Sequence, residues 1–351
     1  MDNFAELLSQ YDYDYPADAV ALVPAEPRDA ARLLVYDATT DQSTSARYAD
    51  ICDYLPPQSC LIFNETKVIP ARVEATKSTG GRVRLLYIKT VGPASFEALA
   101  DRKMEPSSLV LAHGKEIRID SLIDGKYSMT LTDSTSPLDF FLAHGQMPLP
   151  PYLKSTPLQE QTLRERYQTV FAKHTGSVAA PTASLHFTPE LLDKIRSAGH
   201  EIHFVTLHVN IGTFLPLRAE QVQANRLHQE EYLIPAETSA AIRRAKDAGR
   251  PVIAVGTTVV RTLESSDLLT VDAQSDITGQ TTLFIRPGYE FSVIDGLITN
   301  FHVPQSSLLM LVAALIGREK LFELYAQAIA DGFRIFSFGD GMLLLPKHPL
   351  D

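Results

Sequence analysis

The chain has 351 residues, of which 45% are hydrophobic and 21% are charged, and its formal net charge at pH 7 is −10. These values are typical of a well-packed globular protein, and the acidic balance argues at first sight against a nucleic-acid partner. The first residues lack a basic segment followed by an apolar run, so we expect no signal peptide. Cys52 and Cys60 show no CxxC spacing, which favours the reducing cytoplasm.

The first part of the chain predicts strands. Residues 32–38 (RLLVYDA) and 59–63 (SCLIF) have the composition of two short strands. From about residue 72 to residue 147, short β-prone runs alternate with turns, a texture typical of a small antiparallel barrel or sandwich. The proline cluster at 147–153 (MPLPPYL) predicts a domain boundary.

The rest of the chain alternates helices and strands. We expect helices over 188–199, 235–249 and 305–331, and strands over 203–209, 251–256, 296–301 and 333–339. The apolar run at 307–317 is too short to span a bilayer and predicts a buried helix. The sequence therefore predicts a discontinuous α/β domain (residues 1–71 and 148–351) with an inserted antiparallel β-barrel domain (residues 72–147).

Polar residues follow several of these strands or lead into a helix. In alternating α/β proteins, such residues gather at one edge of the sheet, where active sites form. The residues concerned are His186, His208, Gly256, Thr257, Thr258, His302 and Asp340. We therefore expect them to surround one cleft.

The segment VGTTVVRTLES is a strand that turns through Gly256 into a helix. Free backbone N–H groups at the start of that helix suit a carboxylate or phosphate, and Arg261 would add a bidentate partner. The simpler alternative is a capped helix with Arg261 on the surface.

The three histidines leave three interpretations open. His186, His208 and His302 could hold a metal-bound hydroxide, as in a metal-dependent hydrolase, but none has a short-range spacing such as HExxH. They could instead act in acid–base catalysis or substrate contact, or serve as hydrogen-bonded structural residues. For Asp340 the simpler interpretation is a turn cap, and for Arg28 an ion pair.

Basic residues are concentrated in one part of this acidic chain. Between Asn64 and Lys89 there are six basic and two acidic residues. Four of them, Lys67, Arg72, Arg82 and Arg84, are candidates for an RNA-facing stripe. The alternative is a solvated strand face.

Long motifs run through the chain in order, among them PAEPRDAARLLVYD (24–37), LIFNETKVIPARV (61–73), GSVAAPTASLHFT (176–188), VTLHVNIGTFLPLR (205–218), VIAVGTTVVRTLES (252–265), DGLITNFHVPQSSLLMLVAALIG (295–317) and FGDGML (338–343). In these motifs the sequence resembles the S-adenosylmethionine:tRNA ribosyltransferase-isomerase family of queuosine biosynthesis. The resemblance covers nearly the whole chain.

The resemblance implies a reaction and a fold. Members move the ribosyl part of S-adenosylmethionine onto 7-aminomethyl-7-deazaguanine at the tRNA wobble position. They rearrange the sugar to an epoxycyclopentanediol, so that epoxyqueuosine-tRNA, adenine and methionine are the products. No metal or bound cofactor is implied, and the fold is a large barrel-like α/β domain with a small β-barrel insertion. We expect a cytoplasmic enzyme that acts as a monomer.

The implied chemistry suggests roles for the candidate residues. The sulfonium acidifies the C5′ protons, so a base is required, and we predict His186, with His208 and His302 as the other candidates and Asp340 beside them. The methionine carboxylate would bind Thr257, Thr258 and Arg261. The sulfonium would rest on Phe187 or Phe301. Further expected substrate contacts are Arg28, Ser177, Thr182 and Gly256.

The sequence departs from the family pattern at several positions. Gly is usual at Ser184, Gly-Ala at Asn210-Ile211, His at Asn225, Glu at Arg84 and Ala at Gly341. Larger side chains at Ser184 and Asn210-Ile211 could narrow the pocket. A paralogue with an altered substrate and a noncatalytic tRNA-binding relative therefore remain alternatives.

Overall fold

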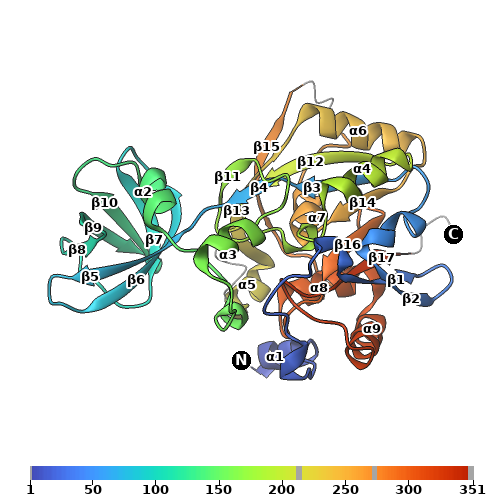
Figure 1. Cartoon of the computed structure of the whole chain (residues 1–351), viewed down its shortest axis with the longest axis horizontal. Helices are drawn as coiled ribbons and strands as arrows, with labels where there is room; N and C mark the ends of the chain where they lie inside the picture. Colours follow the sequence, from blue (N-terminus) through green and yellow to red (C-terminus); the bar gives the residue numbers. More distant parts are fainter. Residues whose placement is uncertain (1, 211–215, 271–274, 347–351) are drawn as a thin grey trace.

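The structure is a computed structural model that describes residues 2–210, 216–270 and 275–346. Its larger part contains a nine-stranded mixed sheet (Figure 1). From one edge to the other, the strands are β15 (Ile277–Leu283), β13 (Arg226–Ile234), β12 (Glu201–Leu207), β3 (Cys60–Asn64), β14 (Val252–Val255), β16 (Gly296–Asn300), β17 (Gly341–Leu345), β1 (Arg32–Asp37) and β2 (Gln42–Arg47).

Alternate residues of the central strands enter two apolar cores. Leu61 and Phe63 of β3 belong to the core that helix α4 (Pro189–Ser197) covers, whereas Cys60 and Ile62 belong to the core on the opposite face. The helices that pack on this second face are α6 (Ala236–Asp247), α7 (Thr257–Glu264), α8 (Ser307–Ile316) and α9 (Arg318–Ala330). The continuous apolar runs of these strands follow from burial on both faces.

The remaining helices are short. They are α1 (Asp2–Ser9), α2 (Pro137–His144), α3 (Glu160–Arg166) and α5 (Ala219–Ala224), together with 3₁₀ turns at Ala17–Ala19, Arg28–Ala30, Tyr48–Asp53, Pro151–Leu153 and Thr182–Ser184. No helix among the described residues is long and apolar enough to cross a membrane.

Six strands close into an antiparallel barrel that stands to one side of the large sheet (Figure 1). They are β5 (Arg72–Lys77), β6 (Arg82–Thr90), β7 (Ser95–Ala100), β8 (Leu109–Ala112), β9 (Lys115–Ile123) and β10 (Lys126–Leu131). Helix α2 adds Phe140 and Phe141 to the barrel core. A two-stranded sheet of β4 (Thr66–Val68) and β11 (His174–Ser177) lies between the two parts.

The chain enters and leaves the barrel at one point. The backbone N–H of Arg72 donates to Gln146, and that of Gln146 donates back to Arg72, at 3.1 and 2.8 Å. A Cβ on the adjacent Gly145 would lie 1.6 Å from the Pro70 carbonyl oxygen, so glycine is required for this close approach. The predicted α/β class with an inserted antiparallel barrel is confirmed. We propose 72–147 as the inserted domain, because these residues contain the six barrel strands and α2.

Two of the predicted elements in the C-terminal region were wrong in detail. Residues 333–339 do not form a strand: Phe336 has a positive φ of 72° and Gly339 N–H closes a turn on its carbonyl, while the strand β17 begins only at Gly341. The aromatic residues of this turn are buried, so the segment has the same apolar composition as a buried strand. The helix expected over 305–331 is two helices, because Gly317 adopts φ 87° between α8 and α9.

The directions of the strands define one functional edge. Strands β12, β3, β14 and β16 run parallel, so their carboxyl ends meet at the same edge of the sheet. Strand β17 runs antiparallel to β16 and pairs Gly341 with Asn300. Its first residue therefore lies at this same edge. The strand predicted over 203–209 corresponds to β12, which begins and ends two residues earlier. His208 therefore lies just past the end of the strand.

Candidate active site

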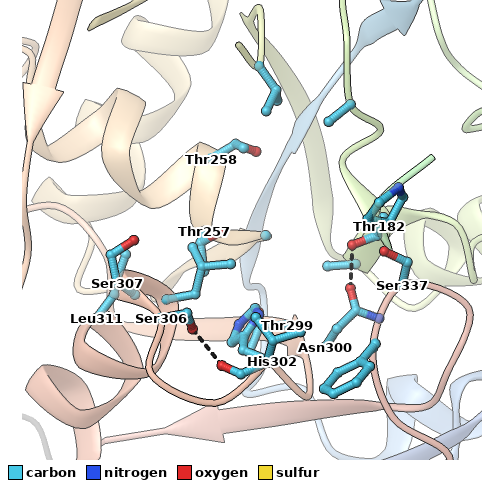
Figure 2. A pocket seen from close by; sticks show the side chains of 18 of the residues that line it. Thr182, Thr257, Thr258, Thr299, Asn300, His302, Ser306, Ser307, Leu311 and Ser337 are labelled. Carbon is cyan, nitrogen blue, oxygen red and sulfur yellow. Dashed lines mark hydrogen bonds between the residues drawn. The ribbon is translucent and has the colours of Figure 1, made fainter. Parts of the chain in front are cut away.

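A cavity of about 470 Å³ opens where the parallel strands end. Its wall combines polar residues that follow β14 and β16 with apolar residues from α8 and from the segment 179–183 (Figure 2). The expected site residues on this wall are Thr182, Gly256, Thr257, Thr258, Arg261, Phe301 and His302. The size is that of a site for a small organic molecule.

The turn from β14 into α7 supplies the first polar part of the wall. Gly256 adopts φ 100°, a conformation that favours glycine, and directs the first turn of α7 toward the cavity. The Asn64 side-chain amide donates to Thr258 Oγ1 at 3.2 Å and to the Leu207 carbonyl at 3.1 Å. The ends of β3, β12 and α7 are thereby held together. The N–H groups at such a helix start favour a bound anion.

Arg261, one turn further along α7, is a buried cation on the cavity wall. Its side chain is only 10% exposed and forms an ion pair with Glu230, which is 3% exposed. The Arg261 Nε donates to the Leu283 carbonyl at 3.2 Å, whereas Nη2 is buried with no hydrogen-bond partner among the described residues. Glu230 also accepts from the backbone N–H of Asn210 at 3.1 Å. One guanidinium nitrogen thus has no partner among the described residues, and a buried donor of this kind calls for one.

His302 is the buried histidine on the cavity wall (Figure 2). Its Nε2 lies 2.9 Å from Thr299 Oγ1, its backbone N–H donates to the Tyr325 hydroxyl, and its carbonyl accepts from the Tyr13 hydroxyl. Burial lowers the pKa of His302 to about 3. The imidazole is therefore neutral at physiological pH, which is the state that a proton acceptor requires.

His186 lies behind the cavity wall. Its Nε2 is 3.4 Å from the amide nitrogen of Asn300, and the Asn300 Oδ1 accepts from Thr182 Oγ1 at 2.8 Å (Figure 2). Asn300 and Thr182 line the cavity, but His186 does not. Burial, and then the charge of Arg334, lower the pKa of His186 to about 3. Both histidines thus lie at the carboxyl end of β16. His302 follows this end in the chain, and His186 contacts its last residue, Asn300.

The segment 176–188 is anchored by its own polar residues. Ser177 Oγ donates to the Ala179 carbonyl at 2.8 Å and accepts from the Val209 N–H at 2.9 Å, so this hydroxyl fixes the loop and does not line the cavity. Phe187 is fully buried against Tyr48 and Phe63, away from the cavity wall. Ser184 is buried too, so its departure from glycine lies behind the wall and not on it.

Asp340 and Arg28 both hold backbone segments. Asp340 accepts from the backbone N–H groups of Arg32 and Arg334 at 2.8 and 2.7 Å, as a turn cap does. The Arg28 guanidinium donates to three backbone carbonyls, of Gln168, Leu185 and Glu165. Neither side chain lines the cavity, so any part they take in catalysis is indirect.

His208 borders a second recess of about 430 Å³ on the other side of β12. Its Nδ1 lies 2.8 Å from Thr66 Oγ1, and a Cβ on Gly176 would come within 2.9 Å of its ring. The structure therefore does not bring His208 together with His302 and His186. Among the described residues, no group of three or more His, Cys, Asp or Glu side chains is arranged to hold a metal ion.

The candidate RNA-binding residues divide by environment. Arg82 and Arg84 are exposed on the outer face of β6, and Arg84 pairs with Asp101 at 2.9 Å. Arg72 is half-buried and donates to the Leu149 carbonyl at 3.2 Å. Lys67 is exposed on β4, between the barrel and the large sheet. Lys67 and Arg82 are thus the members best placed to meet a phosphate.

The remaining departures from the family pattern have local explanations. Asn225 ends α5 in the left-handed conformation with φ 51°, which Asn tolerates better than most residues. The Asn210 side chain donates to the Gln229 carbonyl at 2.9 Å, outside the cavity wall. At Gly341 a Cβ would collide with the Tyr48 hydroxyl, at 2.1 Å. Ile211 lies outside the described residues.

Four residues of the site were not among the predicted ones. Asn64 and Asn300 end β3 and β16, so the strand-end rule would have found them had it been applied to amides as well as histidines. Thr299 precedes Asn300 and is visible only as the partner of His302. Glu230 lies within β13, a strand that the sequence did not predict, and nothing local indicates its pairing with Arg261.

The buried histidines predict an acid-sensitive fold. Below pH 6.5 the unfolded chain binds protons at His186 and His302, whereas the folded chain does not until about pH 3. As the pH decreases from 6.5 toward 3, the free energy of unfolding should therefore fall by about 1.4 kcal/mol per pH unit for each histidine. Denaturant unfolding gives the free energy of unfolding at each pH between 6.5 and 4. Plotted against pH, this free energy should have a slope for His302→Asn that is shallower than that of the wild type by this amount. An unchanged slope would contradict the assignment.

The comparisons with known proteins agree with this geometry. The family model described as queuosine biosynthesis protein matches residues 8–344. An S-adenosylmethionine:tRNA ribosyltransferase-isomerase from Thermus thermophilus is 45% identical over 97% of this chain and 100% of its own length. One from Thermotoga maritima is 42% identical over 96% of this chain and 99% of its own length.

The chain belongs to the queuosine biosynthesis family. A crystal structure of S-adenosylmethionine tRNA ribosyltransferase from Thermotoga maritima, 30% identical in the structural comparison, covers 96% of this chain with a TM-score of 0.55. The family match of residues 8–344 includes every cavity residue named above. The resemblance of the sequence motifs is thereby confirmed, and the cavity is a property of a queuosine biosynthesis family member.

Proposed function

We propose that this protein transfers and isomerises the ribosyl moiety of S-adenosylmethionine onto 7-aminomethyl-7-deazaguanine at the wobble position of tRNA. The products are epoxyqueuosine-tRNA, adenine and methionine. The observation that carries the proposal is the combination of a buried cation with an uncommitted donor, a helix start and a neutral histidine on one cavity wall. Relatives with the corresponding names align over nearly their full lengths.

The cavity has a place for each charged part of S-adenosylmethionine. The methionine carboxylate would bind Arg261 Nη2 and the N–H groups that open α7. The cationic sulfonium would lie against Phe301, the aromatic candidate that lines the cavity. Thr182, held by Asn300, presents a hydroxyl suited to the ribose. Arg28, Ser177 and Asp340 hold the surrounding backbone.

His302 takes the role of the base in this proposal. It accepts a C5′ proton, and the electron pair stays on the carbon next to the sulfonium. As the sugar rearranges, this pair forms the new carbon–carbon bond of the cyclopentane, and the amine of the 7-aminomethyl group forms the new carbon–nitrogen bond to the sugar. Adenine leaves with the electron pair of its glycosidic bond and methionine with that of the C5′–S bond, and the proton that the amine loses balances the one that adenine takes up. His186, which we predicted from the sequence as the base, supports Asn300 from behind the wall.

The proposal is tested by the release of adenine. The protein is incubated with S-adenosylmethionine and tRNA that carries 7-aminomethyl-7-deazaguanine, and adenine is measured by chromatography. Adenine should appear with this tRNA and not with the same tRNA carrying guanine at the wobble position. Release with neither tRNA would favour a noncatalytic tRNA-binding relative, and release only with another acceptor would favour a paralogue with an altered substrate. We propose that the enzyme works in the cytoplasm as a monomer.

Charge reversal at Lys67 and Arg82 should weaken tRNA binding. Both side chains are exposed on the barrel side of the molecule, and affinity for tRNA arises mainly from phosphate contacts. Each lost contact should reduce the slope of log K against log salt by about 0.7 to 0.9. Filter binding of Lys67→Glu/Arg82→Glu measures both effects, and binding of S-adenosylmethionine alone should not change.

The control is Arg244→Glu, which makes one such charge reversal at an exposed position on α6. It should bind tRNA with the wild-type salt dependence. Equal affinity of the double variant and the wild type would make this basic stripe a solvated strand face.

A further inference from the structure

Tyr48 is a buried residue whose hydroxyl group has no evident structural use. The side chain is 0% exposed, and its hydroxyl has no hydrogen-bond partner among the described residues. A buried hydroxyl without a partner is unfavourable and calls for an explanation. Phenylalanine would fill the same place without this cost, so the explanation must lie in the space that the oxygen occupies.

That space is the one that a side chain at position 341 would take. An ideal Cβ built on Gly341 lies 2.1 Å from the Tyr48 hydroxyl oxygen, 2.9 Å from the Thr299 carbonyl oxygen and 3.0 Å from Tyr48 Cζ, so the hydroxyl is its nearest neighbour. Gly341 is the first residue of β17 and pairs in register with Asn300. The Tyr48 hydroxyl therefore occupies space that is free because Gly341 has no side chain.

The opposite side of this contact leads to the cavity. The Tyr48 ring stacks on the His186 imidazole with centroids 4.3 Å apart and planes inclined by 25°. His186 faces the Asn300 amide at 3.4 Å, and Asn300 holds Thr182 on the cavity wall at 2.8 Å. The plane of His186 thus depends on where the Tyr48 ring lies, and the ring is confined by Gly341.

We propose that Tyr48 and Gly341 form an interlocking pair that sets the plane of His186 and, through Asn300, the position of the Thr182 hydroxyl in the substrate cavity. Both are positioning residues and not catalytic ones, since neither lines the cavity. The proposal rests on the proposed function only for its activity readout. It predicts that a side chain at position 341 is most harmful while the Tyr48 hydroxyl is present.

The test is a double-mutant cycle in adenine release with the full-length protein, S-adenosylmethionine and the modified tRNA. Gly341→Ala should lower kcat/KM for S-adenosylmethionine by about 10- to 100-fold, because displacements of about 1 Å are costly in an active site. Tyr48→Phe should stay within about threefold of the wild type. The double variant Tyr48→Phe/Gly341→Ala should recover a large part of the activity that Gly341→Ala loses, because the contact with the hydroxyl is removed while that with the Thr299 carbonyl oxygen remains. Gly92→Ala is the matched control, because a Cβ there meets Ser95 at an ordinary 3.5 Å.

Each outcome decides the proposal. Normal activity of Gly341→Ala, or a double variant as impaired as Gly341→Ala, would overturn it. Should Gly341→Ala alone fail to fold, the double variant decides: soluble and active protein supports the pair, and insoluble or inactive protein overturns it. If the wild type itself releases no adenine, the proposed function fails, and the thermal midpoints of the same four proteins still test the pair through their non-additivity.

Discussion

Replacing His302 by alanine is expected to reduce adenine release by about 10²- to 10⁴-fold, the usual cost of losing a general base. Of the three candidate histidines, His302 is the one that lines the cavity, where His228 also lies. Its neutral imidazole is held by Thr299, and its backbone is held by Tyr325 and Tyr13. Because these backbone contacts do not involve the ring, the variant should fold. Its dissociation constant for S-adenosylmethionine should change far less than its turnover.

Two further histidine variants make this prediction specific. His186→Ala should lose less turnover than His302→Ala, since His186 reaches the cavity only through Asn300. His208→Ala should release adenine within a few-fold of the wild-type rate, since His208 borders the second recess. Single-turnover rates of the three variants at saturating substrate give the ranking. A near-normal His302→Ala beside a His186→Ala protein that binds both substrates without turnover would return the base to His186.

Removing the charge of Arg261 is expected to affect both stability and binding. In Arg261→Met, the Glu230 carboxylate remains buried without its partner, which should lower the free energy of unfolding by about 3–5 kcal/mol. The loss of the Nη2 donor should also weaken binding of S-adenosylmethionine by about 10-fold or more, since a hydrogen bond to a charged group contributes about 1.5–3 kcal/mol. Urea unfolding and calorimetric titration measure the two effects.

The double variant Arg261→Met/Glu230→Met separates these effects. It removes both buried charges, so its stability should return close to that of the wild type, while its affinity for S-adenosylmethionine should stay low. If affinity recovered together with stability, Arg261 would be a structural residue, and the carboxylate site would have to lie elsewhere on the wall.

The sequence predicted the architecture because its signals are local. Thr188 and Pro189 mark the start of α4, and turn residues separate the barrel strands. The strand-end rule also placed Thr257, Thr258 and His302 at one edge of the sheet. Asp340 reaches the same edge for a different reason: it precedes β17, which runs antiparallel to β16, so the start of β17 lies beside the end of β16.

What the sequence could not provide were contacts between distant segments. Arg261 and Glu230 are separated by 31 residues, and His186 and Asn300 by 114. Whether a side chain points into the cavity or behind its wall depends on such contacts and not on the motif that carries it. For this reason His186 was the natural candidate in the sequence, although it stands one layer behind the cavity in the structure.

Ribosyl transfer in this cavity is tested most directly by the nucleoside that forms on the tRNA. The modified tRNA is incubated with S-adenosylmethionine labelled in its ribose carbons, digested to nucleosides and analysed by mass spectrometry. We expect labelled epoxyqueuosine in amounts equal to the adenine released, and its loss in His302→Ala. A methylated nucleoside that carries no ribose label, or undiminished labelled product in the His302→Ala and Arg261→Met proteins, would contradict it.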